Sequence, residues 1–147
     1  MTLIEVKKGL NEALQILYQP PQYQFYGVDV VEGYQRPCFF TKLQPIQMRP
    51  ENYNTYYNQA AFYITYMQKA TDEVDIMKKV EEIKGLFNLY IKIGKRALDV
   101  TGFDYDFIGN DKNILEISID LEWMDRIEHK NSQPLVTDFF LRKEMEE

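Results

Sequence analysis

Residues 115–123 read LEISIDLEW, the clearest alternating pattern in the chain. Apolar and polar side chains alternate along the whole stretch, as in a β-strand with one face against a core and the other in water. Three carboxylates, Glu116, Asp120 and Glu122, belong to the polar face. A register slip of one residue would bury them, so the pairing of this strand is strongly specified.

The residues before this strand predict its hairpin partner. Apolar side chains also alternate over residues 98–107, provided that Gly102 shifts the phase as a β-bulge. Residues 109–113 read GNDKN, a composition typical of a turn. We therefore expect an antiparallel hairpin from about Leu98 to Trp123.

Two amphipathic helices are predicted in the part of the sequence that precedes this hairpin. Thr2 and Glu5 have the spacing of a capping box, and Pro20-Pro21 cannot continue the helix that they open. The second helix is expected to begin at Thr71 or Asp72, both good N-cap residues. Gly94 is its expected C-terminal stop.

Three more strands are expected between the helices, at residues 23–31, 38–48 and 53–68. Pro45 has no backbone donor, which places it at a sheet edge or a bulge. Residues 53–68 are apolar on both faces, with Tyr53, Tyr57, Tyr63 and Met67 sharing one of them. This aromatic face indicates either plain strand propensity or a partly polar protein interface.

The order of these elements predicts an α+β fold. We expect a two-layer domain with two amphipathic helices packed on a mainly antiparallel sheet of four or five strands. A chain of 147 residues without repeats or linkers fits one domain over 1–147. Residues 126–147 mix polar and apolar patches and are expected to form an extended tail.

Composition narrows the possible partners. The net charge is −6 and no Lys/Arg cluster exceeds a pair, which disfavours sequence-specific nucleic-acid binding. No apolar run approaches the ~20 residues that span a bilayer, so we expect no membrane partner. Cys38 is the only cysteine, and a small buried hydrophobe in a cytosolic protein is favoured over a reactive thiol.

The sequence offers no catalytic motif. His129 is the only histidine and lies in a polar stretch, so we expect an exposed side chain and neither a catalytic residue nor a bound cofactor. Five acids on the predicted hairpin need an interpretation: Asp104, Asp106, Glu116, Asp120 and Glu122. They could hold a divalent cation, form the wet face of a half-buried sheet, or repel a passing polyanion. The expectation is the wet face, with no metal ligands.

Several segments carry a resemblance to a known family. These are the opening helix LIEVKKGL at 3–10, the stretch GYQRPCFFTKL at 33–43, the long strand 53–67, the Asp72-Glu73 helix start and the charged end at 142–144. In this order and spacing the chain resembles the tail terminator family of phages and prophages of Gram-positive bacteria. The likeness spans nearly the whole chain, apart from residues 128–134.

The resemblance implies a structural protein and not an enzyme. It implies a homo-hexamer that can be a monomer before assembly. The hexamer would form a ring on the tail tube, end tail polymerisation and join tail to head. Its partners would be the tail tube protein and a head-completion or connector protein, in the host bacterial cytoplasm during assembly and then in the virion tail. Glu116, Asp120 and Glu122 would face the lumen that carries DNA, and the subunit interface would include Tyr53, Tyr57, Tyr63 and Met67.

Two other functions stay open at this point. A neck or head-closure protein of the same particle would have a similar composition. A small metal-dependent hydrolase that uses the acidic cluster is the enzymatic alternative.

Overall fold

The computed structural model describes residues 1–20, 22–27, 32–109 and 113–128. Its elements in chain order are α1 (Leu3–Leu17), β1 (Gln24–Tyr26), β2 (Cys38–Asn52), β3 (Thr55–Met67), α2 (Glu73–Phe87), β4 (Tyr90–Ile93), β5 (Arg96–Ile108) and β6 (Ile114–Arg126). His129 and most of the predicted tail lie outside the described residues, as do parts of the predicted first strand and of the 109–113 turn.

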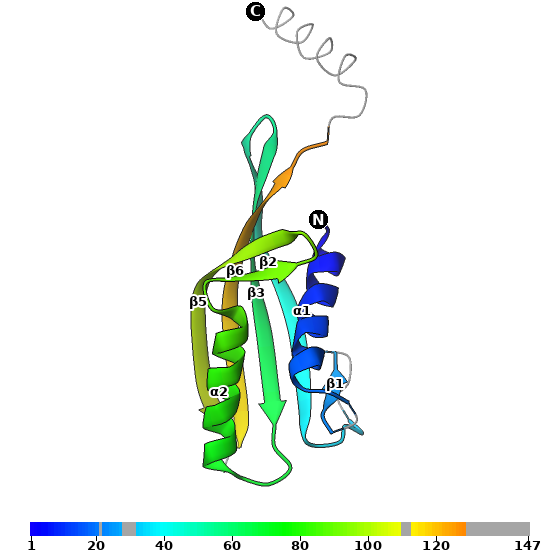
Figure 1. Ribbon diagram of the computed structural model, residues 1–147, viewed down its shortest axis with the longest axis vertical. Coiled ribbons are helices and arrows are strands. Elements are labelled where there is room, and N and C mark those ends of the chain that lie inside the picture. Colours follow the sequence, from blue (N-terminus) through cyan, green and yellow to red (C-terminus); the bar gives the residue numbers. More distant parts are fainter. Residues whose placement is uncertain (21, 28–31, 110–112, 129–147) are drawn as a thin grey trace, which may run out of the picture.

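The strands form one sheet in the order β1-β2-β3-β6-β5-β4. Both helices pack on the same face of it, so the expected two-layer α+β architecture is confirmed (Figure 1). The expected four or five strands are wrong, because the sheet has six. It is also mixed, since the short β1 runs parallel to β2 while the other neighbours are antiparallel.

The missed strand β4 follows from a wrong helix end. We expected α2 to continue to Gly94, but it stops at Asn88, which adopts a left-handed conformation with φ 46°. Gly94, with φ 60°, instead makes the tight turn between β4 and β5. Asparagine accepts this conformation more readily than most residues and can therefore end a helix as glycine does.

The predicted helix starts and bulges are confirmed. Thr2 Oγ1 accepts the backbone N–H of Glu5 at 3.2 Å, and the Glu5 carboxylate accepts the N–H of Thr2 at 3.2 Å. The side chain of Asp72 caps α2 by accepting two backbone N–H groups. Register shifts occur between Pro45 and Gln47 and between Val100 and Gly102, the two places where bulges were expected.

The core lies between the helices and one face of the sheet. The central strands β3 and β6 pair along their whole length, with Phe62 opposite Ile119 and Ile64 opposite Ile117. The core-facing side chains of β6 are all buried: Leu115, Ile117, Ile119, Leu121 and Trp123. From the helices they meet Val6, Leu10, Leu14, Ile76, Val80, Ile83 and Phe87. None of the described helices is long and apolar enough to cross a membrane.

The β2–β3 hairpin extends beyond the helices as a long arm, with the end of β6 beside it (Figure 1). Its tip is the turn between Asn52 and Thr55. Large apolar side chains on the arm are exposed: Ile46, Met48, Tyr53, Tyr56 and Met124. The arm therefore offers protein-binding surface outside the core.

A buried lysine ties the two helices to the sheet. The ammonium of Lys79 on α2 lies 2.8 Å from Asp75 Oδ1, and its side chain is only 5% exposed. The rings of Tyr18, Tyr23 and Tyr66 surround it, with centroids 5.1–5.3 Å away. Cation–π attraction and the ion pair together compensate for the removal of the charge from water.

The carboxylate of Asp75 is held by more than this lysine. It accepts hydrogen bonds from the Tyr66 hydroxyl at 2.7 Å and from the Gln68 amide at 2.9 Å. Burial by itself would raise the pKa of Asp75, but the hydrogen bonds from Lys79, Tyr66 and Gln68 outweigh it and lower that pKa. The folded state therefore favours the ionised carboxylate.

Removing the lysine should destabilise the fold. We expect Lys79→Met to lower the free energy of unfolding by roughly 3 kcal/mol, because it leaves Asp75 without its cation in a partly buried site. The matched control Lys78→Met, on the exposed neighbouring residue, should change it by less than about 0.5 kcal/mol. Chemical denaturation measures both. Equal losses in the two variants would contradict the role given to Lys79.

The lowered pKa of Asp75 also predicts a pH dependence. A carboxyl group whose pKa is lower in the folded than in the unfolded state stabilises the fold at pH values above its unfolded-state pKa. This stabilisation is lost as the pH falls through the folded-state pKa. Wild-type protein should thus lose stability below about pH 4. Asp75→Asn should be less stable at neutral pH, and its stability should fall less steeply below about pH 4 than that of the wild type. Thermal melts at several pH values measure both. The same steepness in variant and wild type would contradict the prediction.

Candidate functional site

The sheet face that points away from both helices carries the acidic residues singled out by the sequence. We call it the open face, since no helix covers it within the described part of the chain. Register pairs Asp106 with Glu116, Asp104 with Ser118, and Asp99 with Glu122 across β5 and β6. Six carboxylates share this face: Asp99, Asp104, Asp106, Glu116, Asp120 and Glu122.

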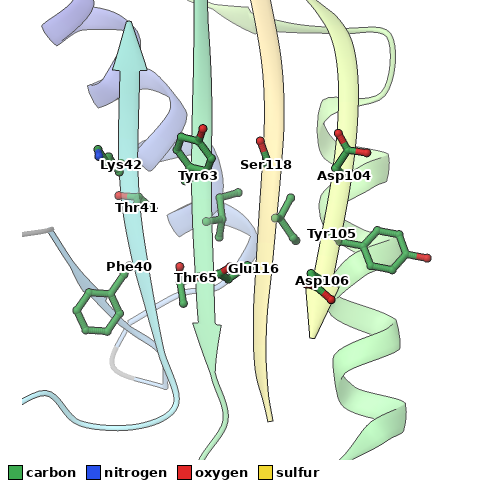
Figure 2. A pocket seen from close by; sticks show the side chains of 12 residues that line it. Phe40, Thr41, Lys42, Tyr63, Thr65, Asp104, Tyr105, Asp106, Glu116 and Ser118 are labelled. Atoms are coloured by element: carbon green, nitrogen blue, oxygen red, sulfur yellow. The ribbon is translucent and has the colours of Figure 1, made fainter. Parts of the chain in front are cut away.

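The other half of the open face comes from β2 and β3. Figure 2 shows Lys42, Tyr63, Ser118 and Asp104 side by side on four successive strands. The next row toward the end of β5 holds Phe40, Thr65, Glu116 and Asp106 (Figure 2). Together these rows line a shallow open depression of about 560 Å³.

The carboxylates of the open face are largely uncompensated. Within the described residues none of the six forms an ion pair, and neither does Lys42. Two of them accept a hydrogen bond: Glu122 Oε2 from the Tyr57 hydroxyl at 2.6 Å, and Asp106 Oδ1 from the backbone N–H of Phe107 at 2.9 Å. A set of like charges this close stabilises nothing locally, since neighbours of the same sign repel one another.

The acids are poorly arranged for a metal ion. Residues two apart on a strand lie roughly 6.6 Å from each other, too far to converge on one cation without help from other elements. Among the described residues, no three His, Cys, Asp or Glu side chains gather in a way that could hold a metal. The acids of the open face are thus spread along β5 and β6 as a charged surface.

At Asp120 the strands approach closely. Gly102 lies opposite it at the β5 bulge, and a Cβ on residue 102 would come within 2.7 Å of Asp120 Oδ2. Asp120 itself is only partly exposed. The glycine that the sequence marks as a phase shift thus also leaves room for a carboxylate.

The aromatic residues predicted as a subunit interface do not form one patch. Tyr57 and Tyr63 lie on the open face beside β6, and Met67 follows on the same face at the end of β3. Tyr57 and Met67 are ten residues apart on the strand, roughly 33 Å. Tyr53 lies in the turn at the tip of the arm and is 61% exposed. Both predicted residue sets thus share one sheet face, apart from Tyr53.

Sequence reasoning missed two cations of the open face on β2. Lys42 and Arg49 lie on β2 opposite Tyr63 and Tyr57. The Arg49 guanidinium lies 4.5 Å from the Tyr57 ring centroid and pairs with Glu51 at 3.0 Å. The alternation of residues 38–44 was the available signal for Lys42, because Phe40 and Lys42 share a face in any regular strand.

Comparison with known proteins identifies relatives by sequence and by fold. A family model described as "Phage tail terminator protein" matches residues 5–133, a range that contains α2 and all six strands. A solved structure that is 13% identical has a TM-score of 0.52 and covers 89% of this chain and 99% of its own. At that identity the likeness shows the fold alone. Among curated protein sequences no significant match is found.

The hydrogen bond between Tyr57 and Glu122 gives a prediction for the open face. This bond, followed by desolvation, raises the pKa of Tyr57 above its ordinary value. In Glu122→Gln the Tyr57 pKa should fall toward that value, because the charged acceptor is gone. NMR titration of ¹³C-labelled tyrosine measures it. Glu116→Gln is the control and should leave Tyr57 unchanged, whereas an unchanged pKa in Glu122→Gln would contradict the contact.

Proposed function

The chain belongs to the phage tail terminator family, and from this premise we propose that it caps the tail tube as a hexameric ring, ends tail polymerisation and joins the tail to the head. Membership gives the protein a structural role in a phage tail. The match over residues 5–133 carries the proposal, because it covers nearly the whole described fold. The proposed partners are the tail tube protein and a head-completion or connector protein, met during assembly in the host cytoplasm.

The open face supports a position at the lumen of such a ring. Glu116, Asp120 and Glu122 lie on the central strand β6 and point away from both helices. DNA that passes through the tail carries one phosphate charge per ~1.7 Å of its axis. A wall that held phosphates would slow it, and a carboxylate-lined wall repels them instead.

The range of this repulsion suits a narrow channel. At physiological ionic strength exposed charges act over about 8 Å, the Debye length. Carboxylates on the wall would therefore act on DNA only when it passes close to them. Two cations of the open face, Lys42 and Arg49, lie on β2 at the side of the sheet.

The arm supports contact with a protein partner. Two of its apolar side chains, Ile46 and Met48, are more than half exposed although they lie within β2. Exposed apolar and aromatic groups of this kind are typical of protein interfaces. We assign the arm to the docking of the ring on another tail component.

Deletion of the gene is the decisive test. A phage without this protein should produce tubes of uncontrolled length that lack heads, because nothing ends polymerisation. Electron microscopy of lysates measures tail length and head attachment, with the plasmid-borne gene as the control. Tails of normal length without heads would instead indicate a neck or head-closure protein, and normal particles would contradict both.

A charge reversal tests the lumen position. Glu116→Lys should leave tail length normal, because residue 116 is exposed and carries no structural bond among the described residues, but it should slow DNA ejection. The added cation attracts phosphates in the channel, and higher salt should relieve the delay. Glu81→Lys, on the exposed side of α2, is the matched control. Unchanged ejection in Glu116→Lys would contradict a lumen-facing sheet.

A further inference from the structure

We propose that neighbouring copies meet edge to edge in the ring, with Lys42 on the β2 edge of one copy against Asp104 and Asp106 on the β5 edge of the next. The partner is a second copy of this chain. The inference rests on the proposed ring, and it names the contact that would build it.

Both lateral edges of the sheet are largely uncovered. Among the described residues, β1 pairs only with Cys38–Phe40 of β2. From Thr41 onward, β2 pairs with β3 on one side and has no paired strand on its outer side. At the opposite side β4 pairs only with residues 96–99 of β5, and Val100 N–H donates to the Leu89 carbonyl at 2.9 Å. Residues 101–108 have no outer strand in the described part of the chain. In the described part of the chain each copy therefore carries two different free edges, as a head-to-tail ring requires.

The charges on these two edges are opposite. On the open face the β2 edge carries Lys42, whereas the β5 edge carries Asp104 and Asp106. Within one chain Lys42 and Asp104 are three strand spacings apart, roughly 14 Å, so they do not pair with each other. Two copies placed edge to edge would bring them to one strand spacing, about 5 Å.

The register sets these charges at the same level along the strands. Lys42 pairs with Tyr63, Tyr63 with Ser118, and Ser118 with Asp104, so one row crosses the sheet from edge to edge. The strand directions alternate from β2 through β3 and β6 to β5. A β5 edge placed beside β2 of the next copy is therefore antiparallel to it, and Lys42 meets Asp104 without any axial shift. A closed ring needs this, because an axial shift at each contact would produce a helix.

Side chains, and not a long backbone ladder, carry this contact. Pro45 and Pro50 lie on the free part of β2, and neither has an N–H to donate. Proline and charged side chains on edges are common means of preventing indiscriminate strand pairing. An edge protected in this way favours a partner with complementary charge, which steers association and sets its register.

The contact also divides the acids of the open face into two groups. Lys42 of the neighbouring copy would pair with Asp104 and lie one row from Asp106, so it would offset one of these two charges. Glu116, Asp120 and Glu122 on β6 lie one strand further in and would stay unpaired at the lumen. A single sheet face thus serves both for assembly at its sides and for repulsion of DNA at its centre.

Charge exchange tests the contact in a phage that lacks the gene and receives it from a plasmid. Lys42→Glu should lower the yield of head-bearing tails of normal length about tenfold or more, because each contact now opposes like charges. The double variant Asp104→Lys/Asp106→Lys should do the same. Lys8→Glu, on the exposed side of α1, is the control and should behave as wild type.

Two rescues separate lost contact from lost folding. Lys42→Glu combined with Asp104→Lys/Asp106→Lys in one chain should restore normal tails, because every contact again has opposite charges. Co-expression of the two defective variants should restore them as well, in rings where the two alternate. Folding of each purified variant is checked by its thermal melt.

The outcomes distinguish this inference from the proposed function. If the wild-type gene fails to end tube growth, the proposed function is wrong and the contact has no ring to build. If the wild type works and Lys42→Glu works equally well, the edge contact is wrong while the function stands. Failure of both rescues with well-folded variants also overturns the contact.

Discussion

The pairing register of β6 with β3 is the constraint on which the rest of the structure depends. The two strands pair from Thr55–Arg126 to Met67–Ile114 without a bulge, and every second residue of β6 is buried. Each fully buried Ile or Leu stabilises the fold by roughly 1.5–3 kcal/mol, so a slip by one residue would cost several such contributions at once. The same alternation sends Glu116, Ser118, Asp120 and Glu122 to the other face. Core and charged surface are thus two consequences of one register.

Local features were predictable because each depends on a few neighbouring residues. The capping box at Thr2, the cap at Asp72 and the bulges at Pro45 and Gly102 follow from side-chain chemistry and backbone freedom alone. Pairing is different, because periodicity shows that a strand exists but not which strand lies beside it or in which direction. The parallel pairing of β1, with three residues, left no such signal, and β4 was hidden behind a helix end at Asn88.

For the candidate site, the same limit had a larger effect. The sequence shows that Asp104, Asp106, Glu116, Asp120 and Glu122 can share one wet face, and the register confirms it. It gives no indication that Lys42 stands in the same row as Asp104, since β2, β3, β6 and β5 are far apart in the chain. Nor does alternation indicate that Tyr57 donates to Glu122, which joins two residue sets expected to have separate roles.

Buried and exposed charges are treated differently in this protein, and this contrast bears on the proposed assembly. Lys79 is buried, yet an ion pair and three aromatic rings satisfy it, because an unpaired charge in that position would cost several kcal/mol. On the open face no ion pair compensates the carboxylates in the described part of the chain, and only Glu122 and Asp106 accept hydrogen bonds there. Folding alone would tolerate neutral polar residues there equally well, since alternation needs polarity and not charge. Six acids on one face, with a lysine at its far edge, therefore exceed what the fold requires, and the proposed contacts with DNA and with neighbouring subunits would account for both signs.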